Sequence, residues 1–237
     1  MSSGIYLATA GAVAQSQALD TTANNIANAS TAGFRADRVT FKEALNGAKS
    51  VDTAVVAHAG TRVDQQGGAL NPTSNPLDCA LEGDGYFAVQ TKDGPRYTRA
   101  GNFQLDAERK LVTAEGNPLR GDGGATISIP PDAQNVTIAA DGTVSADGAN
   151  VGKLELAKFA PNQLRREGNT LFAATGKPQA GDPPKVHSGM LEASNVNVVR
   201  GVVDLVKVSR TYESLMQIIQ GYHDVESRAA RELGGPK

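Results

Sequence analysis

The chain has 237 residues, of which 26 are glycine and none is tryptophan, and its formal net charge is −2 at pH 7. This near-neutral balance offers no electrostatic attraction to nucleic acid or to an anionic membrane, and the abundant glycine predicts many turns. A single cysteine, Cys79, excludes an intrachain disulfide and a cysteine-based zinc site, and no apolar run reaches the ~18 residues of a membrane-spanning helix, so no direct membrane insertion is expected.

Residues 4–29 are predicted to form a helix with a narrow apolar stripe. Apolar residues recur there every seven positions, which is the spacing of a helix that packs against another helix. The stripe comprises Ile5, Ala12, Leu19 and Ile26. Burying an anchor such as Leu19 gains only ~1.5–3 kcal/mol, whereas ordering each backbone residue costs ~1–2 kcal/mol. We therefore expect this helix to become ordered only when it packs against other chains.

The helix is predicted to end in an asparagine-rich motif. The chain reads Ala-Asn-Asn-Ile-Ala-Asn over residues 23–28 and Thr-Ala-Gly-Phe-Arg over residues 31–35. Each asparagine taken singly is explained by helix capping, because its side chain bonds nearby backbone groups. As a block, residues 23–35 resemble the N-terminal signature of the flagellar basal-body rod and hook proteins, the axial proteins of the bacterial flagellum. The motif residues are Asn24, Asn25, Ile26, Ala27, Asn28, Gly33 and Phe34.

Residues 36–76 are predicted to be an extended connector. A short helix is predicted at residues 38–47, and short strands at residues 55–57 and 61–63. Elsewhere in the segment, valine, threonine, glycine and asparagine occur with little periodicity. The Gln-Gly-Gly-Ala-Leu run at residues 66–70 also resembles the stretch that precedes the middle domain of the same family.

Residues 77–189 are predicted to form a β-rich outer domain. The apolar pattern changes to a period of two, and turns rich in glycine and aspartate separate the short segments. Many short strands at close spacing indicate an antiparallel sandwich or a barrel-like domain. The predicted strands are residues 79–81, 86–91, 96–99, 103–105, 111–113, 126–129, 136–138, 143–145, 152–159 and 171–174.

Residues 197–233 are predicted to form the second helix. Asn195 and Asn197 offer N-cap side chains, and Gly-Gly-Pro at residues 234–236 ends the helix. Heptad spacing predicts that its stripe and that of the first helix pack as one coiled-coil-like helical domain. The same spacing is equally compatible with the buried face of an ordinary amphipathic helix. The stripe comprises Val198, Leu205, Val208, Tyr212, Leu215, Ile219 and Tyr222.

Three further segments resemble the same family, in the family's own order. Residues 77–89 resemble the opening of its middle domain, and residues 97–106 follow at the expected spacing. Residues 189–197, which include Ser194, Asn195 and Asn197, resemble the segment that introduces its C-terminal helix. The resemblance implies a mainly β protein with terminal helices. The expected domains are residues 1–35 with 190–237 as a discontinuous helical axial core, 36–76 as the connector and 77–189 as the antiparallel β domain.

The resemblance implies a structural subunit of the flagellar basal-body rod, which assembles itself into the axial drive shaft that transmits torque to the hook. The implied partners are further copies of the chain, other rod and hook axial proteins, and the flagellar type III export apparatus, with the two heptad stripes as the assembly surface. No basic residue precedes Arg35, so a cleaved signal peptide is not expected, and the resemblance implies export to the periplasm-spanning basal body. The short connector and compact β domain resemble proximal rod proteins more than distal ones, which are the alternative within the family.

Residues that could support catalysis or bind a metal are scattered. His58, His187 and His223 lie in different regions and form no metal-binding motif. Cys79 lies in a predicted strand, where a buried structural thiol is expected rather than a nucleophile. The turn at residues 82–85 lacks the ligand spacing of a calcium loop or a phosphate loop. Neither a cofactor nor an enzymatic activity is therefore expected. The rival from another class is a soluble β-domain enzyme or binding module with a helical oligomerisation clasp.

Overall fold

The computed structural model describes residues 2–45 and 54–233, and the chain divides into two compact units. The first, which we call the helical unit, comprises Met1–Ala27, Asp37–Asp64 and Asn197–Lys237. The second, the β unit, comprises Asn28–Ala36 and Gln65–Val196. Each unit is therefore built from segments that are far apart in the sequence.

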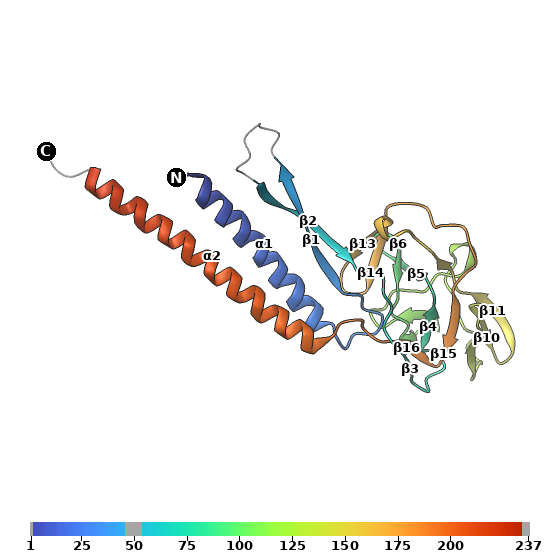
Figure 1. Ribbon diagram of the computed structural model, residues 1–237. Coiled ribbons are helices and arrows are strands. Elements are labelled where there is room, and N and C mark those ends of the chain that lie inside the picture. The colour runs from blue at the N-terminus through green and yellow to red at the C-terminus, as the bar shows by residue number, and fades with distance from the viewer. Residues whose placement is uncertain (1, 46–53, 234–237) are drawn as a thin grey trace. The chain divides into compact units, whose positions relative to one another are not determined.

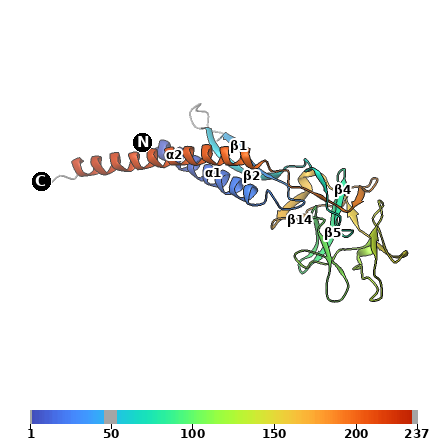
Figure 2. The ribbon, with the colours of Figure 1, turned by 90° about the horizontal axis from the view of Figure 1, so that it is seen from below.

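Two long helices form most of the helical unit. Helix α1 spans Ser2–Ala27 and helix α2 spans Val198–Leu233, so both predicted terminal helices are confirmed. They lie side by side and run in opposite directions (Figures 1 and 2). The C-terminal end of α2 continues beyond the N-terminal end of α1, because α2 has 36 residues and α1 has 26.

Glycines allow α1 and α2 to approach each other closely. In antiparallel order, the contacting pairs are Gly4–Tyr222, Gly11–Leu215 and Ile26–Gly201. A Cβ atom at Gly11 would lie 3.5 Å from Cδ1 of Leu215, and one at Gly201 would lie 2.9 Å from Cγ1 of Ile26. In each pair a large side chain of one helix covers a glycine of the other. The glycines that weaken helix propensity thus determine the register of the pair.

A β-hairpin completes the helical unit. Strand β1 (Asp37–Leu45) pairs antiparallel with β2 (Ala54–Val63), and both strands pack against α1. The prediction of a helix at residues 38–47 is wrong, since residues 38–45 belong to β1 and residues 46–47 lie outside the described residues. A strand is held by backbone bonds to a distant partner, which the local pattern of a segment does not reveal. The two strands predicted at residues 55–57 and 61–63 both lie in β2.

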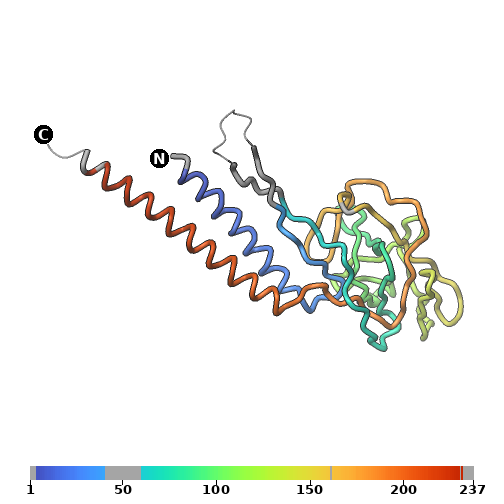
Figure 3. Tube along the Cα trace, in the orientation of Figure 1, coloured from blue at the N-terminus to red at the C-terminus, as the bar shows by residue number. Residues whose placement is uncertain are grey.

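The β unit consists of short strands and two single-turn 3₁₀ helices. Figure 3 traces the path of the chain through this unit. The strands are β3 (Leu70–Pro72), β4 (Cys79–Glu82), β5 (Tyr86–Thr91), β6 (Gly94–Thr98), β7 (Phe103–Leu105), β8 (Leu111–Thr113), β9 (Val136–Ile138), β10 (Thr143–Ala146), β11 (Ala149–Lys153), β12 (Leu156–Ala157), β13 (Leu164–Glu167), β14 (Leu171–Ala174), β15 (Lys185–Ser188) and β16 (Met190–Glu192). The 3₁₀ helices are η1 (Asp122–Gly124) and η2 (Pro161–Gln163).

The pairings between these strands are antiparallel, which confirms the predicted sheet type. One sheet has the order β12-β5-β6-β14-β13 and another has the order β11-β10-β9. Three two-stranded pairs, β15-β4, β16-β3 and β7-β8, complete the unit. The segment predicted as a strand at residues 126–129 forms isolated bridges instead, and the predicted strand 152–159 is divided between β11 and β12.

One apolar cluster forms the core of the β unit. Phe87 and Phe103 meet edge to face with their ring centroids 5.0 Å apart, and Leu111 and Leu119 are fully buried beside them. Burying a side chain of this size contributes ~1.5–3 kcal/mol. The core members come from residues 79–186, so this unit has an apolar core of its own.

Candidate functional site

The predicted heptad stripes lie in the helical unit, where α1 packs against α2. Ala12 is buried, and Ile5, Leu19 and Ile26 are half-buried. On α2, the half-buried stripe residues are Leu205, Val208, Tyr212, Leu215 and Ile219, whereas Val198 and Tyr222 are exposed. The structure therefore brings the two stripes together within one chain, at the contacts of Gly11 with Leu215 and of Gly201 with Ile26.

A second apolar surface on α2 remains exposed. We call it the valine face, and it consists of Val198, Val199, Val202, Val203 and Val206. Val199 is 77% exposed and Val203 is 63% exposed. Ile218 and Val225 are also exposed further along the helix. An exposed apolar patch of this kind marks a protein-protein contact surface.

The valine face was not predicted, although its signal is present in the sequence. Valines at residues 199, 202, 203 and 206 follow the helical spacing i, i+3, i+4 and i+7. The helix thus carries two apolar faces, and only one of them is needed to pair with α1. The spacing of the apolar residues did not indicate which of these two faces pairs with α1.

The motif asparagines of the helical unit organise the ends of its elements. Both side-chain atoms of Asn25 bond the backbone of Asp37, since Oδ1 accepts from its N–H at 2.9 Å and Nδ2 donates to its carbonyl at 2.8 Å. Asn197 caps α2, because its Oδ1 accepts a hydrogen bond from the Arg200 N–H at 3.0 Å. Asn24 and Ala27 lie exposed near the end of α1.

The other motif residues lie in the β unit. Asn28 is buried and accepts a hydrogen bond from the Thr31 hydroxyl at 3.2 Å. Phe34 is fully buried, and the guanidinium of Arg166 lies 4.7 Å from the centre of its ring. Gly33 has a φ of +67°, and a Cβ atom there would lie 2.2 Å from the Ala100 nitrogen. Only glycine fits at such a position.

Asn195 joins the C-terminal segment of the β unit to its other segments, and the neighbouring Ser194 bonds within that segment. The Asn195 Oδ1 accepts from the Ala36 N–H at 2.7 Å, and its Nδ2 donates to the Gln66 carbonyl at 2.9 Å. The Ser194 hydroxyl oxygen accepts from the Val196 N–H at 3.3 Å. The family motifs at both ends of the chain therefore hold together the segments at which the chain enters and leaves the β unit.

A buried charged cluster lies beside these motifs. Glu192, which is 2% exposed, accepts from Arg35 Nη2 at 2.9 Å and from Arg99 Nη1 at 3.2 Å. Its Oε1 also accepts from the Gly68 N–H at 3.3 Å, and its backbone carbonyl accepts from the Gly33 N–H at 2.7 Å. Arg35 and Glu192 lie inside family motifs, but the sequence did not predict a role for either, because their partnership spans most of the chain.

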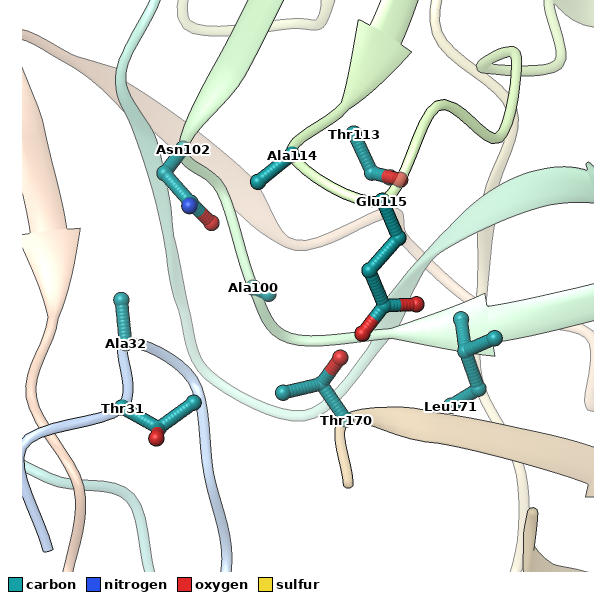
Figure 4. Close-up of a pocket in the computed structure, with 9 residues that line it drawn as sticks. All are labelled: Thr31, Ala32, Ala100, Asn102, Thr113, Ala114, Glu115, Thr170 and Leu171. Atoms are coloured by element: carbon teal, nitrogen blue, oxygen red, sulfur yellow. The ribbon is translucent and has the colours of Figure 1, made fainter. Parts of the chain in front are cut away.

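A small cavity of about 120 Å³ also lies in the β unit. Figure 4 shows the carboxylate of Glu115 directed toward the space beside Thr170 and Leu171. The remaining lining residues are Thr31, Ala32, Ala100, Asn102, Thr113 and Ala114. Glu115 is the only titratable residue of this lining.

Metal ligands do not gather in the part of the chain that the structure describes. Among residues 2–45 and 54–233, no group of three or more histidine, cysteine, aspartate or glutamate residues is arranged to hold a metal ion. His187 forms a contact of 2.7 Å with Glu82, and His223 is exposed on α2. None of the described helices combines the length and the apolarity needed to span a membrane.

Cys79 is predicted to be chemically silent in the folded protein. It is fully buried, as expected from its place in a strand. Burial, with a smaller contribution from the negative charge of Asp78, raises the pKa of its thiol from 9.0 to about 12. We expect iodoacetamide at about pH 8 to leave the folded chain unmodified and to alkylate Cys79 after denaturation, as mass spectrometry would detect. Alkylation at equal rates in both states would contradict the expectation.

Because the thiol of Cys79 ionises at a lower pH in the unfolded chain than in the folded chain, the stability of the fold should also fall as the pH rises above 9.0.

A two-helix unit with a second exposed apolar face, joined to a β unit with its own core, is typical of a structural subunit that packs against other subunits. Comparison with known families agrees. Residues 5–35 match the model of flagella basal body rod proteins, residues 80–146 match the D1 domain of the flagellar hook protein FlgE/F/G, and residues 187–232 match the C-terminal region of flagellar basal body rod FlgEFG proteins.

Similar proteins span the whole chain. The flagellar basal-body rod protein FlgF of Escherichia coli is 38% identical over 251 residues, which cover 98% of this chain and 99% of the relative. FlgF of Rhizobium meliloti is 31% identical over 241 residues and covers 100% of both chains. The flagellar basal-body rod protein FlgG of Bacillus subtilis is 36% identical over 231 residues, which cover 85% of this chain and 88% of the relative.

The chain belongs to the flagellar basal-body rod protein family and is a structural subunit of the bacterial basal-body rod. This family is structural, and its members are located in the flagellar basal body. Membership implies assembly with other rod and hook proteins.

Proposed function

We propose that the chain is a proximal rod subunit that assembles with copies of itself and with other axial proteins into the drive shaft that transmits torque to the hook. The short connector and the compact β domain support this position, because both resemble those of proximal rod proteins.

The two heptad stripes are proposed to pair as an antiparallel coiled-coil-like core within the discontinuous domain of residues 1–35 and 190–237. Residues 36–76, of which Asp37–Asp64 belong to the helical unit, would then link this core to the outer β domain at residues 77–189. The close glycine contacts support such pairing, because small residues let helix backbones approach. On this proposal the stripe residues serve assembly by giving each subunit a rigid two-helix element.

The valine face is proposed to bind the helices of neighbouring subunits. The single observation that carries this proposal is that α2 exposes a continuous apolar face after its other face has packed against α1. Val199 and Val203 would each gain ~1.5–3 kcal/mol if fully buried by a neighbour. Val225, further along α2, is exposed as well and could be buried by a neighbour in the same way.

Export through the flagellar type III apparatus, without a cleaved signal peptide, is proposed to deliver the chain to the periplasm-spanning rod. The composition of α1 supports this route, since its buried side chains include Ala8, Ala12, Ala14 and Ala18, which contribute little apolar area. A helix held by so little burial unfolds readily when its partner is absent. The proposal includes no catalytic step, no cofactor, no nucleic acid and no membrane insertion.

Cross-linking in isolated basal bodies tests the assembly proposal. Because Cys79 is buried, Val203→Cys would supply the only reactive thiol, and a thiol-to-amine cross-linker should join this chain to adjacent rod subunits. Lys92→Cys, on an exposed turn of the β unit, is the matched control and should give markedly fewer cross-links. Equal yields from the two variants, or no cross-linking of Val203→Cys, would contradict the proposal.

A further inference from the structure

A second cavity in the β unit lies against the buried charged cluster. Its volume is about 230 Å³, and its lining includes Arg35, Gln65, Tyr86, Arg99 and Lys158. The two arginines are 3% and 2% exposed, so their guanidinium groups belong to the interior of the unit. The cavity is therefore bordered by cations that are held in place by packing.

Polar hydrogens of this lining lack protein partners. Nε of Arg35, Nε of Arg99 and Nε2 of Gln65 are all buried and make no hydrogen bond to another protein group. The remaining donors of the same residues are engaged: Arg35 Nη1 donates to the Gln65 carbonyl, and Arg99 Nη1 donates to the Leu81 carbonyl at 3.1 Å. Buried donors without an acceptor are costly, at ~1–3 kcal/mol each. The three residues that carry these donors line one cavity, so an acceptor at its wall would lie close to them.

The charges around the cavity do not balance. Arg35 and Arg99 share the single carboxylate of Glu192, which leaves one positive charge in excess in the interior. Lys158 adds a third cation, and it pairs at 3.5 Å with Asp84, the one acidic residue in the cavity lining. Burial, and then the charge of Arg35, lower the pKa of Arg99, which shows that the two guanidiniums oppose each other. An excess buried charge favours the entry of a compact anion.

The geometry of the donors also indicates that the acceptor is an oxygen atom. The planar guanidinium fork matches the paired oxygens of a carboxylate or a phosphate better than it matches a spherical halide. Tyr86 lines the same cavity and donates its hydroxyl to the Gln65 Oε1 at 3.1 Å, which leaves Gln65 Nε2 as a donor. The guanidinium of Arg99 lies 5.3 Å from the centre of the Tyr86 ring, and this contact helps to fix its orientation.

We propose that this cavity binds a small oxyanion of the carboxylate or phosphate class, held by Arg35, Arg99 and Gln65. The bound anion supplies the missing negative charge and the missing hydrogen-bond acceptors. It thereby locks together the three segments that carry these residues, namely 28–36, the start of 65–196 and strand β6 with its following turn. This inference is independent of the proposed assembly, since it concerns the isolated chain.

The test uses the full-length chain and titrates acetate and inorganic phosphate at constant ionic strength. We expect saturable binding by calorimetry and a rise in the melting temperature of the β unit that sodium chloride does not reproduce. Gln65→Glu should act as a built-in anion, because it places a carboxylate oxygen where the unpartnered amide nitrogen lies. That variant should melt at a higher temperature without added anion and should bind phosphate at least tenfold more weakly.

Gln104→Glu is the matched control, since it adds the same charge at an exposed position of β7. It should bind phosphate and acetate as the unaltered chain does. Equal anion responses in the unaltered chain and in Gln65→Glu would indicate a general salt effect and overturn the proposal. Absence of saturable binding in the unaltered chain, or destabilisation by Gln65→Glu, would overturn it as well.

Discussion

Glu192→Gln is expected to destabilise the β unit by about 3–5 kcal/mol, because it removes one partner from a buried ionic cluster. Glu192 is 2% exposed, and its carboxylate bonds both Arg35 and Arg99. The substitution preserves the size and shape of the side chain, so the loss reports charge and hydrogen bonding rather than a cavity. The midpoint of urea unfolding, followed by circular dichroism of the β-sheets, measures the effect.

The matched control is Glu155→Gln in the same unit. Glu155 accepts from Arg120 Nε at 2.9 Å, but both side chains of this pair are partly exposed to solvent. A partly exposed pair of this kind contributes about 1 kcal/mol or less, so this variant should unfold close to the unaltered chain. A loss of stability from Glu192→Gln no larger than that from Glu155→Gln would show that the cluster does not hold the unit together.

Leu215→Asp is expected to abolish incorporation of the chain into the rod while leaving the β unit folded. Leu215 is half-buried on the face of α2 that meets α1, and its Cδ1 would lie 3.5 Å from a Cβ atom added at Gly11. An aspartate there loses the apolar contact and brings a charge against α1, which costs about 2–4 kcal/mol. The helix pair buries mainly alanine side chains and only half-buries its larger aliphatic ones, so it does not have the stability to tolerate such a loss. Motility of complemented cells and the content of isolated basal bodies measure the effect.

Gln220→Asp provides the control for Leu215→Asp. Gln220 is exposed on the same helix, so an added charge there should leave helix pairing and rod incorporation unchanged. Hydrogen exchange of β5 should be the same in both variants, because the β unit has a separate core. Normal motility of the Leu215→Asp strain would show that the heptad stripe is not required for assembly.

Local signals in the sequence were sufficient for the elements whose stability is mainly local. Heptad spacing and the Asn197 cap predicted α2 almost to the residue, and alternating apolar residues predicted β5 with its observed bounds. Strands β3, β13, β15 and β16 escaped prediction, and each depends on a partner strand for its backbone hydrogen bonds. The same dependence explains why residues 38–45 form a strand rather than the predicted helix.

The features of the candidate site also divide into those that the sequence predicts and those that depend on the fold. The amino-acid sequence by itself determined the family motifs, the two heptad stripes and the terminal helices, because periodicity and capping act within a few residues of chain. Only the tertiary structure decided that Leu215 faces Gly11, that the valine face stays exposed, and that Arg35 shares Glu192 with Arg99. Arg35 and Glu192 are 157 residues apart, and their attraction becomes strong only after folding has removed water from between and around them. Burial and charge pairing over such a distance are properties of the folded chain, and no local pattern contains them.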